Sequence, residues 1–300
     1  MTDTNNARND EHTPEDTSRS RSAGDRSVRV DVGGYHLVLH AAGTGWPTVV
    51  LEAGGGLASD TWDAVWEPLT RLTHVVRYDR AGLGVSEAAP APCTYHDMVS
   101  ALYALLQGAG IAGPYILVGH SMGGVLVRVF AEQYPTAVVG LVLIDAVHPQ
   151  QNQRALALLP PQRADESPEL AGLRRNLRLI RDPATTTLDD DPNRVNWYTS
   201  EAQAQALGTL DDLPLVVLTQ GRPLAFPPDF PTDFADYIAH AYHPMFQELQ
   251  ADLARLSSRS KHVIAQHSGH MIHQDEPELV VASIREVVEA VRRSEQPKTR

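Results

Sequence analysis

The sequence contains a single cysteine, Cys93, among its 300 residues. One cysteine cannot form a disulfide within the chain, so nothing indicates an oxidising compartment. The sequence also lacks any run near the roughly 20 apolar residues that a membrane-spanning helix requires, and its first residues lack the apolar stretch of a secretory signal. These absences predict a cytoplasmic protein that does not enter a membrane.

Positive charge is scarce as well, because 25 Lys and Arg residues stand against 37 Asp and Glu residues, giving a formal net charge of -12 at pH 7. Nucleic acids and anionic membrane surfaces would repel such a chain at long range, so we expect neither as a partner. The chain is 42% hydrophobic, which at this length allows one large α/β domain with a substantial buried core.

The first 27 residues contain almost no large apolar side chains and many Thr, Asn, Asp, Glu, Arg and Ser residues. A segment of this composition cannot bury a core. We therefore expect a disordered tail over residues 1–27 and one domain over residues 28–300.

Strand and helix patterns alternate from residue 28 onward. The first two strand patterns meet at Gly33-Gly34, which predicts an antiparallel hairpin. Strand patterns then cover residues 48–51, 74–78, 115–118, 138–144, 215–218 and 262–265, and helical patterns cover residues 60–72, 95–106, 125–134, 234–256 and 277–291. This alternation predicts an α/β fold with a doubly wound, mostly parallel sheet. Prolines separate helical segments between residues 147 and 212, where no strand pattern occurs, so we expect a helical insertion there.

The strongest functional signal is the turn Gly119-His120-Ser121-Met122-Gly123, which joins a strand pattern to a helical pattern. A G-x-S-x-G turn in this context holds its serine in a strained conformation that exposes the hydroxyl to a substrate. The following helix directs its backbone N–H groups toward the same place, where negative charge would develop. We expect Ser121 to be a nucleophile and the N–H of Met122 to be one donor of an oxyanion hole.

A serine needs a base to remove its proton, and His270 is the best-placed histidine. It lies after the last strand pattern, and loops that follow the carboxyl ends of parallel strands converge on one edge of the sheet. His267 and His273 are its rivals, although either would otherwise face solvent or cap a helix. The histidines near residue 270 share no regular helix face and no cysteine is close, so we do not expect a metal site.

The base in turn needs a carboxylate to orient it, and the order serine, acid, histidine is expected for such a triad on this kind of sheet. Asp145 directly follows the strand pattern over residues 138–144, which fixes its position rigidly. The alternatives in the later proline-rich stretch are Asp229, Asp233 and Asp236. We favour Asp145, and the alternatives would otherwise be exposed loop carboxylates or, for Asp233, a helix cap.

A second oxyanion donor is expected from the loop Gly54-Gly55-Gly56 after the strand pattern over residues 48–51. Gly55 is our choice, because a residue without a side chain lets the backbone approach a ligand closely. The three glycines could instead form only a sharp turn. They are not a phosphate-binding loop, since no Gly-Lys-Ser/Thr follows.

Taken together, these features resemble the α/β-hydrolase family over nearly all of residues 28–291. The stretch from Asp79 to Ser86 is similar to the family's D-R-x-G-x-G-x-S loop, and Ser268-Gly269-His270 followed by Pro277-Glu278 is similar to its terminal block. Where many relatives carry His-Gly in the oxyanion loop, this chain has Ala53-Gly54, preceded by Glu52. The resemblance implies that the insertion over residues 147–212 forms a cap, and that the acid follows either of the two strands considered above.

The predicted function is a serine hydrolase that cleaves a carboxylic ester or related small-molecule acyl substrate through an acyl-enzyme, without a cofactor. An acyltransferase and a non-catalytic ligand-binding protein of the same fold are the alternatives. Apolar residues that would suit an acyl site, but that we expect in ordinary core, are Trp197, Tyr198, Phe226, Phe230 and Met245. The sequence gives no oligomeric state.

Overall fold

The structure is a computed structural model that describes residues 26–188 and 191–295, and within them one eight-stranded sheet has the order β1-β2-β4-β3-β5-β6-β7-β8. The strands are β1 (Arg26–Asp31), β2 (His36–Ala42), β3 (Thr48–Glu52), β4 (Val75–Asp79), β5 (Tyr115–His120), β6 (Val138–Ile144), β7 (Leu215–Gln220) and β8 (Ser260–Ala265). Strand β2 pairs antiparallel with β1 and β4, and all other pairs are parallel. The predicted mostly parallel sheet with an antiparallel N-terminal hairpin is confirmed.

The start of the domain differs from the prediction. Residues 1–25 of the predicted tail lie outside the described residues. Arg26 and Ser27, which the sequence analysis assigned to the tail, belong to β1 and pair with Ala41 and His40 of β2. Both are exposed on an edge strand, so no apolar periodicity marks them, and backbone pairing alone extends the strand to Arg26.

The helical elements are η1 (Ser59–Trp62), α1 (Asp63–Thr70), α2 (Tyr95–Gly108), α3 (Met122–Gln133), η2 (Pro135–Ala137), α4 (Gln151–Leu158), α5 (Pro168–Leu179), α6 (Trp197–Gln205), α7 (Thr232–Tyr237), η3 (Ile238–Tyr242), α8 (His243–Leu253), α9 (Ile272–Asp275) and α10 (Pro277–Glu295). The helix expected over residues 234–256 is divided by η3, a π-helical turn. Pro244 explains the change, because a proline has no N–H to donate to the carbonyl four residues earlier. No helix in the described part of the chain is both long and apolar enough to span a bilayer.

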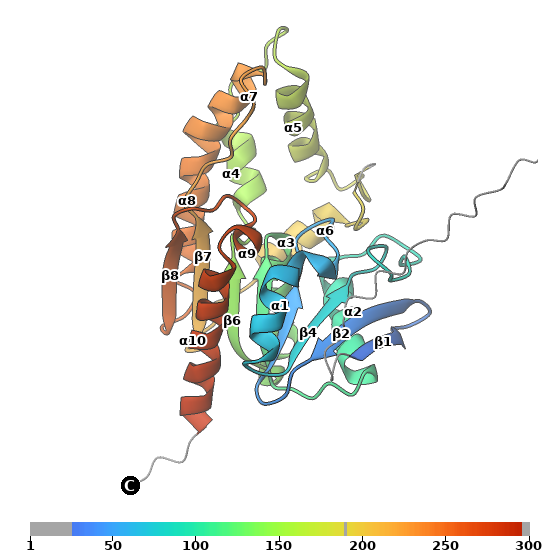
Figure 1. Cartoon of the computed structure of the whole chain (residues 1–300). Helices are drawn as coiled ribbons and strands as arrows, with labels where there is room; N and C mark the ends of the chain where they lie inside the picture. Colours follow the sequence, from blue (N-terminus) through green and yellow to red (C-terminus); the bar gives the residue numbers. More distant parts are fainter. Residues whose placement is uncertain (1–25, 189–190, 296–300) are drawn as a thin grey trace, which may run out of the picture.

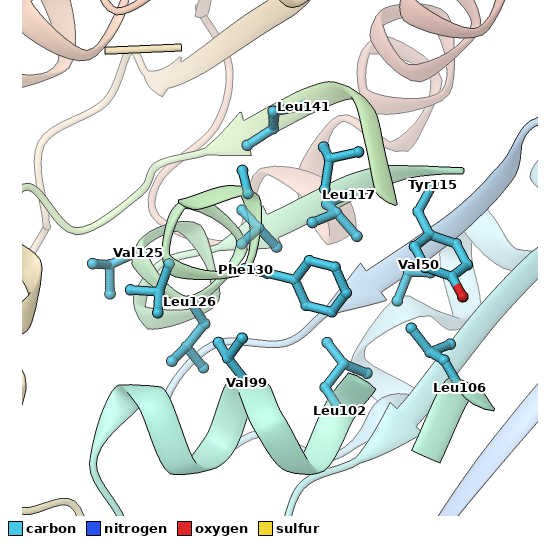
Figure 2. Close-up of a cluster of buried hydrophobic side chains, with 14 of the residues drawn as sticks. Val50, Val99, Leu102, Leu106, Tyr115, Leu117, Val125, Leu126, Phe130 and Leu141 are labelled. Carbon is cyan, nitrogen blue, oxygen red and sulfur yellow. The ribbon is translucent and has the colours of Figure 1, made fainter. Parts of the chain in front are cut away.

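Apolar side chains of the parallel strands alternate between two clusters, one on each face of the sheet. Val50 and Leu117 belong to the cluster covered by α2 and α3, and Figure 2 shows Phe130 of α3 between Leu117 and Leu102 of α2. The neighbouring Val118 points to the other face, into the cluster covered by α1 and α10. A sheet buried on both faces is a rigid base for the loops at its carboxyl edge.

Helices stand beyond that edge, and Figure 1 shows α4, α5 and α7 grouped there. We call residues 151–179 and 232–246 the roof, which comprises α4, α5, α7, η3 and the start of α8. Two small apolar clusters join its two segments, Leu177 with Met245 in one and Leu170 with Tyr237 in the other. The roof thus combines part of the insertion over residues 147–212 with a second segment that follows β7.

Candidate active site

Ser121 occupies the sharp turn between β5 and α3, with backbone angles φ 53° and ψ -120°. This conformation is strained for a residue with a side chain, and such residues cluster at functional sites. Two backbone hydrogen bonds fix the turn, because the N–H of Ser121 donates to Ile144 O at 3.0 Å and its carbonyl accepts from Val147 N at 2.9 Å. The end of β6 therefore holds the serine in place.

The glycines beside Ser121 are required by close backbone approach. A Cβ on Gly123 would overlap the backbone carbonyl of Glu52 at the end of β3, and a Cβ on Gly119 would overlap the carbonyl of Gly123. Absence of these side chains lets the first turn of α3 lie directly against the loop after β3. The two expected sources of oxyanion donors are thereby adjacent.

Asp145 and His270 are brought together at the same sheet edge, although they are 125 positions apart in the chain. Asp145 lies one residue beyond β6, also at positive φ (46°), and its backbone N–H donates to Leu218 O of β7. His270 Nδ1 donates to Asp145 Oδ2 at 2.6 Å, and Gln220 N donates to the other carboxylate oxygen at 2.9 Å. This arrangement leaves Nε2 of His270 as the nitrogen that can accept a proton.

The rival histidines and aspartates lie elsewhere. His267 is exposed, and His273 is buried with Nε2 2.8 Å from the hydroxyl of Thr61. Asp229 is exposed in the loop before α7, and Asp233 accepts a hydrogen bond from Ser167 N in the roof. None of these four side chains contributes to the cavity that contains Ser121.

Ser121, Asp145 and His270 line one cavity of about 290 Å³. The rest of its wall consists of Val147, Gln151, Gln220, Leu224, Ile238, Tyr242, His243 and Phe246. Five of these come from the roof, and Tyr242 and His243 flank the junction of the π-helical turn with α8. None of these eight residues was predicted from the sequence, because they are polar and apolar residues spread over three segments without a common pattern.

The five apolar residues considered for an acyl site do not line this cavity. Met245 packs in a roof cluster with Leu249, and the rings of Phe226 and Phe230 stack on each other at 4.6 Å. Met245 is therefore a core residue, as expected, and Phe226 packs against a second small cluster.

A larger cavity of about 640 Å³ lies between α5 and α7, lined by residues such as Leu158, Leu170 and Tyr237. It contains neither Ser121 nor His270. We take the smaller cavity as the candidate active site, because it contains the candidate nucleophile and base and the larger one contains neither.

The positions of the expected oxyanion donors agree with this assignment. Met122 is the first residue of α3, and N–H groups in the first turn of a helix have no partner within the helix. A Cβ placed on Gly55 would lie 3.8 Å from Cβ and Sδ of Met122. The two residues expected to donate, Met122 and Gly55, thus lie side by side next to the turn of Ser121.

Comparison with known proteins gives the family. The sequence model of the alpha/beta hydrolase family matches residues 37–283. The chain belongs to this family. YqjL, an uncharacterized protein of Bacillus subtilis (strain 168), is 26% identical to this alpha/beta hydrolase over 263 residues, which cover 88% of this chain and 91% of that protein.

Two solved structures share the fold. A thermophilic esterase from Thermogutta terrifontis has a TM-score of 0.59 and 23% identity, over 89% of this chain and 99% of that chain. A loop variant of the haloalkane dehalogenase DbeA from Bradyrhizobium elkanii has a TM-score of 0.64 and 16% identity, over 90% and 98%. At these identities the likeness establishes the fold alone, so the chemistry of this alpha/beta hydrolase must be argued from its site.

Burial has opposite consequences for the acid and for a neighbouring histidine. It raises the pKa of Asp145, while the hydrogen bonds from His270 and Gln220 favour the carboxylate and oppose that rise. Burial also lowers the pKa of His120 well below its usual range, so that ring is neutral. Its Nε2 lies 3.0 Å from the backbone carbonyl of His270 and donates to it.

His120 is a site residue that the sequence analysis did not single out. Its ring lies 4.6 Å from the ring of His270 and 4.5 Å from that of His273. The hydrogen bond to His270 O fixes the loop that carries His270, and the neutral ring adds no charge beside it. The sequence could have pointed to His120 only through its position directly before Ser121 in the same turn.

The described residues contain no group of three or more His, Cys, Asp or Glu side chains arranged to hold a metal ion.

Proposed function

We propose that this alpha/beta hydrolase is a serine hydrolase that cleaves a carboxylic ester or a related acyl compound through an acyl-enzyme on Ser121. The observation that carries the proposal is the shared cavity of a strained serine and a histidine whose Nδ1 is held 2.6 Å from a buried carboxylate. Nucleophile, base and orienting acid are the three parts that acyl transfer by a serine requires.

In the first half of the reaction, Ser121 Oγ attacks the acyl carbonyl while His270 Nε2 takes the hydroxyl proton. Asp145 stabilises the imidazolium that forms, and its bond to Nδ1 keeps Nε2 free to take the proton. The N–H groups of Met122 and Gly55 donate to the oxyanion, and His270 then returns the proton to the departing alcohol.

In the second half, His270 takes a proton from water, and the resulting hydroxide attacks the acyl carbonyl. The tetrahedral intermediate collapses with release of the carboxylic acid, and the proton returns to Ser121 Oγ. Every proton transfer uses the same nitrogen, so one histidine serves both halves of the reaction.

The cavity volume indicates the size of the acyl group. About 290 Å³ lies at the small end of the roughly 300–1,000 Å³ that ligand pockets occupy. Apolar side chains, Leu224, Ile238 and Phe246, share its wall with polar ones. We propose short, partly polar acyl groups as substrates rather than long fatty chains.

Labelling with a fluorophosphonate probe, followed by mass spectrometry of the adduct, tests the proposal. We expect one adduct, on Ser121, and hydrolysis of p-nitrophenyl acetate and butyrate that falls by at least about 10⁴-fold in Ser121→Ala. Ser283→Ala removes another buried serine, whose hydroxyl bonds Leu279 O in α10, and it should keep both activities. A wild-type protein that neither labels nor hydrolyses the esters would disprove the proposal.

A further inference from the structure

Arg80 lies directly beneath the loop that follows β3. It is 5% exposed, and its guanidinium donates to two backbone carbonyls of that loop, Ala53 O at 2.6 Å and Gly54 O. It also donates to the carboxylate of Glu52 at 2.5 Å. One side chain therefore holds the last residue of β3 and the two loop residues that precede Gly55.

The bond to Gly54 O bears on Gly55 through the geometry of the peptide. The bond between Gly54 and Gly55 is trans, so its carbonyl and its N–H lie in one plane and point in opposite directions. A cation that fixes the carbonyl on one side therefore directs the N–H of Gly55 toward the other. It also polarises the peptide, since hydrogen bonds in a chain strengthen one another.

We propose that Arg80 is a positioning residue of the oxyanion hole, which aims and polarises the Gly55 N–H by binding the Gly54 carbonyl. The inference rests on the proposed function, in which that N–H stabilises the oxyanion formed on attack by Ser121. Arg80 touches neither the substrate nor the reacting atoms, and it acts through the peptide alone.

Glu52 allows this buried cation to exist. The carboxylate is 1% exposed, binds Arg80 and accepts a second hydrogen bond from the hydroxyl of Tyr78. Burial raises the pKa of Glu52, and the charge of Arg80 opposes that rise. A buried guanidinium without such a counter-charge would be strongly destabilising. Each residue of the sequence Glu52-Ala53-Gly54 therefore binds Arg80. Glu52 neutralises its charge, and the carbonyls of Ala53 and Gly54 accept its hydrogen bonds.

The fourth partner of Arg80 connects the loop with the segment that returns from the roof. Arg80 Nε donates to Asn193 Oδ1 at 3.2 Å. Asp191 in turn orders this segment by accepting from Asn193 N and Val195 N, and the backbone of Asn196 pairs with Cys93. The guanidinium plane is thus fixed from two sides, and its orientation at Gly54 is determined.

The test uses the double variant Arg80→Gln with Glu52→Gln, which removes both buried charges and leaves a neutral, polar side chain at each position. We expect kcat for p-nitrophenyl butyrate to fall about 50-fold with KM changed less than about 3-fold, because loss of a complete oxyanion donor costs about 10²–10³ in kcat. The affinity for a trifluoromethyl ketone, which forms an oxyanion adduct on the serine, should fall by the same factor. A merely structural role would not produce this matched loss.

Two single variants and one control separate charge, position and stability. Glu52→Gln removes the counter-charge of Arg80 but leaves its bonds to Ala53 and Gly54, so the free energy of unfolding should fall while kcat of the folded enzyme changes less than about 3-fold. Arg80→Lys keeps the counter-charge of Glu52 but replaces the planar fork with a single ammonium, and we expect kcat to fall about 10-fold. Arg128→Gln removes another buried arginine, on α3, and should leave kcat within about 2-fold of the wild type.

The outcomes are distinguishable. If the wild type turns over ester in a Ser121-dependent way and the double variant keeps kcat and ketone affinity within about 3-fold, the inference is overturned while the proposed function stands. If the wild type shows no Ser121-dependent turnover, the proposed function fails and this inference with it. If the double variant does not fold, Arg80→Lys is measured instead, and kcat and ketone affinity within about 3-fold of the wild type would overturn the inference.

Discussion

The sheet below the candidate active site is held by two large apolar clusters, one on each face, whereas the roof above it is held by two small ones. The backbone N–H groups of Ser121 and Asp145 donate to carbonyls of the neighbouring strands β6 and β7, which attaches both residues to the sheet. Tyr242 and His243, by contrast, enter the cavity from a π-helical turn joined to α8.

The sheet edge and the roof therefore differ in how firmly they hold their side chains. Groups that must keep their geometry for chemistry are fixed by a core that tolerates little movement. We expect the groups that select among substrates to lie in the roof, where the buried apolar clusters are small and local stability is correspondingly lower. We expect substitutions at the sheet edge to remove activity, and substitutions in the cavity wall above it to change the preferred substrate.

The largest expected effect concerns the acid at the sheet edge. Asp145→Asn should lower kcat/KM by about 10³-fold or more, because an amide neither fixes the His270 tautomer nor stabilises the imidazolium. Asp229→Asn changes an exposed aspartate after β7 and should leave kcat/KM within about 2-fold. Steady-state kinetics on one ester compares the two, and the reverse result would transfer the role of the acid to Asp229.

A smaller effect is expected on stability in acid, from His273 beneath the sheet edge. Burial lowers the pKa of His273 from 6.5 to about 4. Between these values the unfolded chain binds more protons than the folded one, so stability is complete above pH 6.5 and is lost as the pH falls toward 4. The loss by pH 4.5 should be roughly 2 to 3 kcal/mol from this residue.

Urea unfolding of the wild type and His273→Gln at pH 7 and pH 4.5 measures this contribution. Glutamine keeps a hydrogen-bonding partner for Thr61 but does not titrate. The variant should therefore lose less stability than the wild type between the two pH values, by roughly 2 to 3 kcal/mol. Equal losses in the two proteins would show that His273 does not carry the acid sensitivity.

The smallest expected effect concerns the cavity wall outside the sheet. Leu224→Ala should increase the ratio of kcat/KM for p-nitrophenyl octanoate to that for butyrate by about 10-fold, because it widens the cavity that contains Ser121. Leu158→Ala is the matched control, since Leu158 is also exposed (43% against 55%) but lines the larger cavity between α5 and α7. An equal change of the ratio in both variants would contradict this expectation and would show that the larger cavity also contacts the acyl chain.

Features carried by consecutive residues were predictable. The nucleophile turn joins a buried strand to a helix within a few positions, so its strain and exposure follow from local sequence. The mostly parallel sheet was predictable for the same reason, because strand and helix patterns alternate along the chain. The position of His270 at the same edge as Ser121 was predictable because loops after parallel strands share an edge. The break at Pro244 and the extra residues of β1 were missed, because one depends on a single absent N–H and the other on backbone pairing of exposed residues.

Local sequence was enough to predict the class of fold, the strained serine and the sheet edge at which its partners lie. Three contacts depend instead on the packing of distant segments: Asp145 with His270, the second roof segment with the first, and Arg80 with the carbonyl of Gly54. The reason is physical: a turn or a strand is set by interactions among near neighbours, whereas a contact between residues 125 positions apart depends on how the whole chain packs between them.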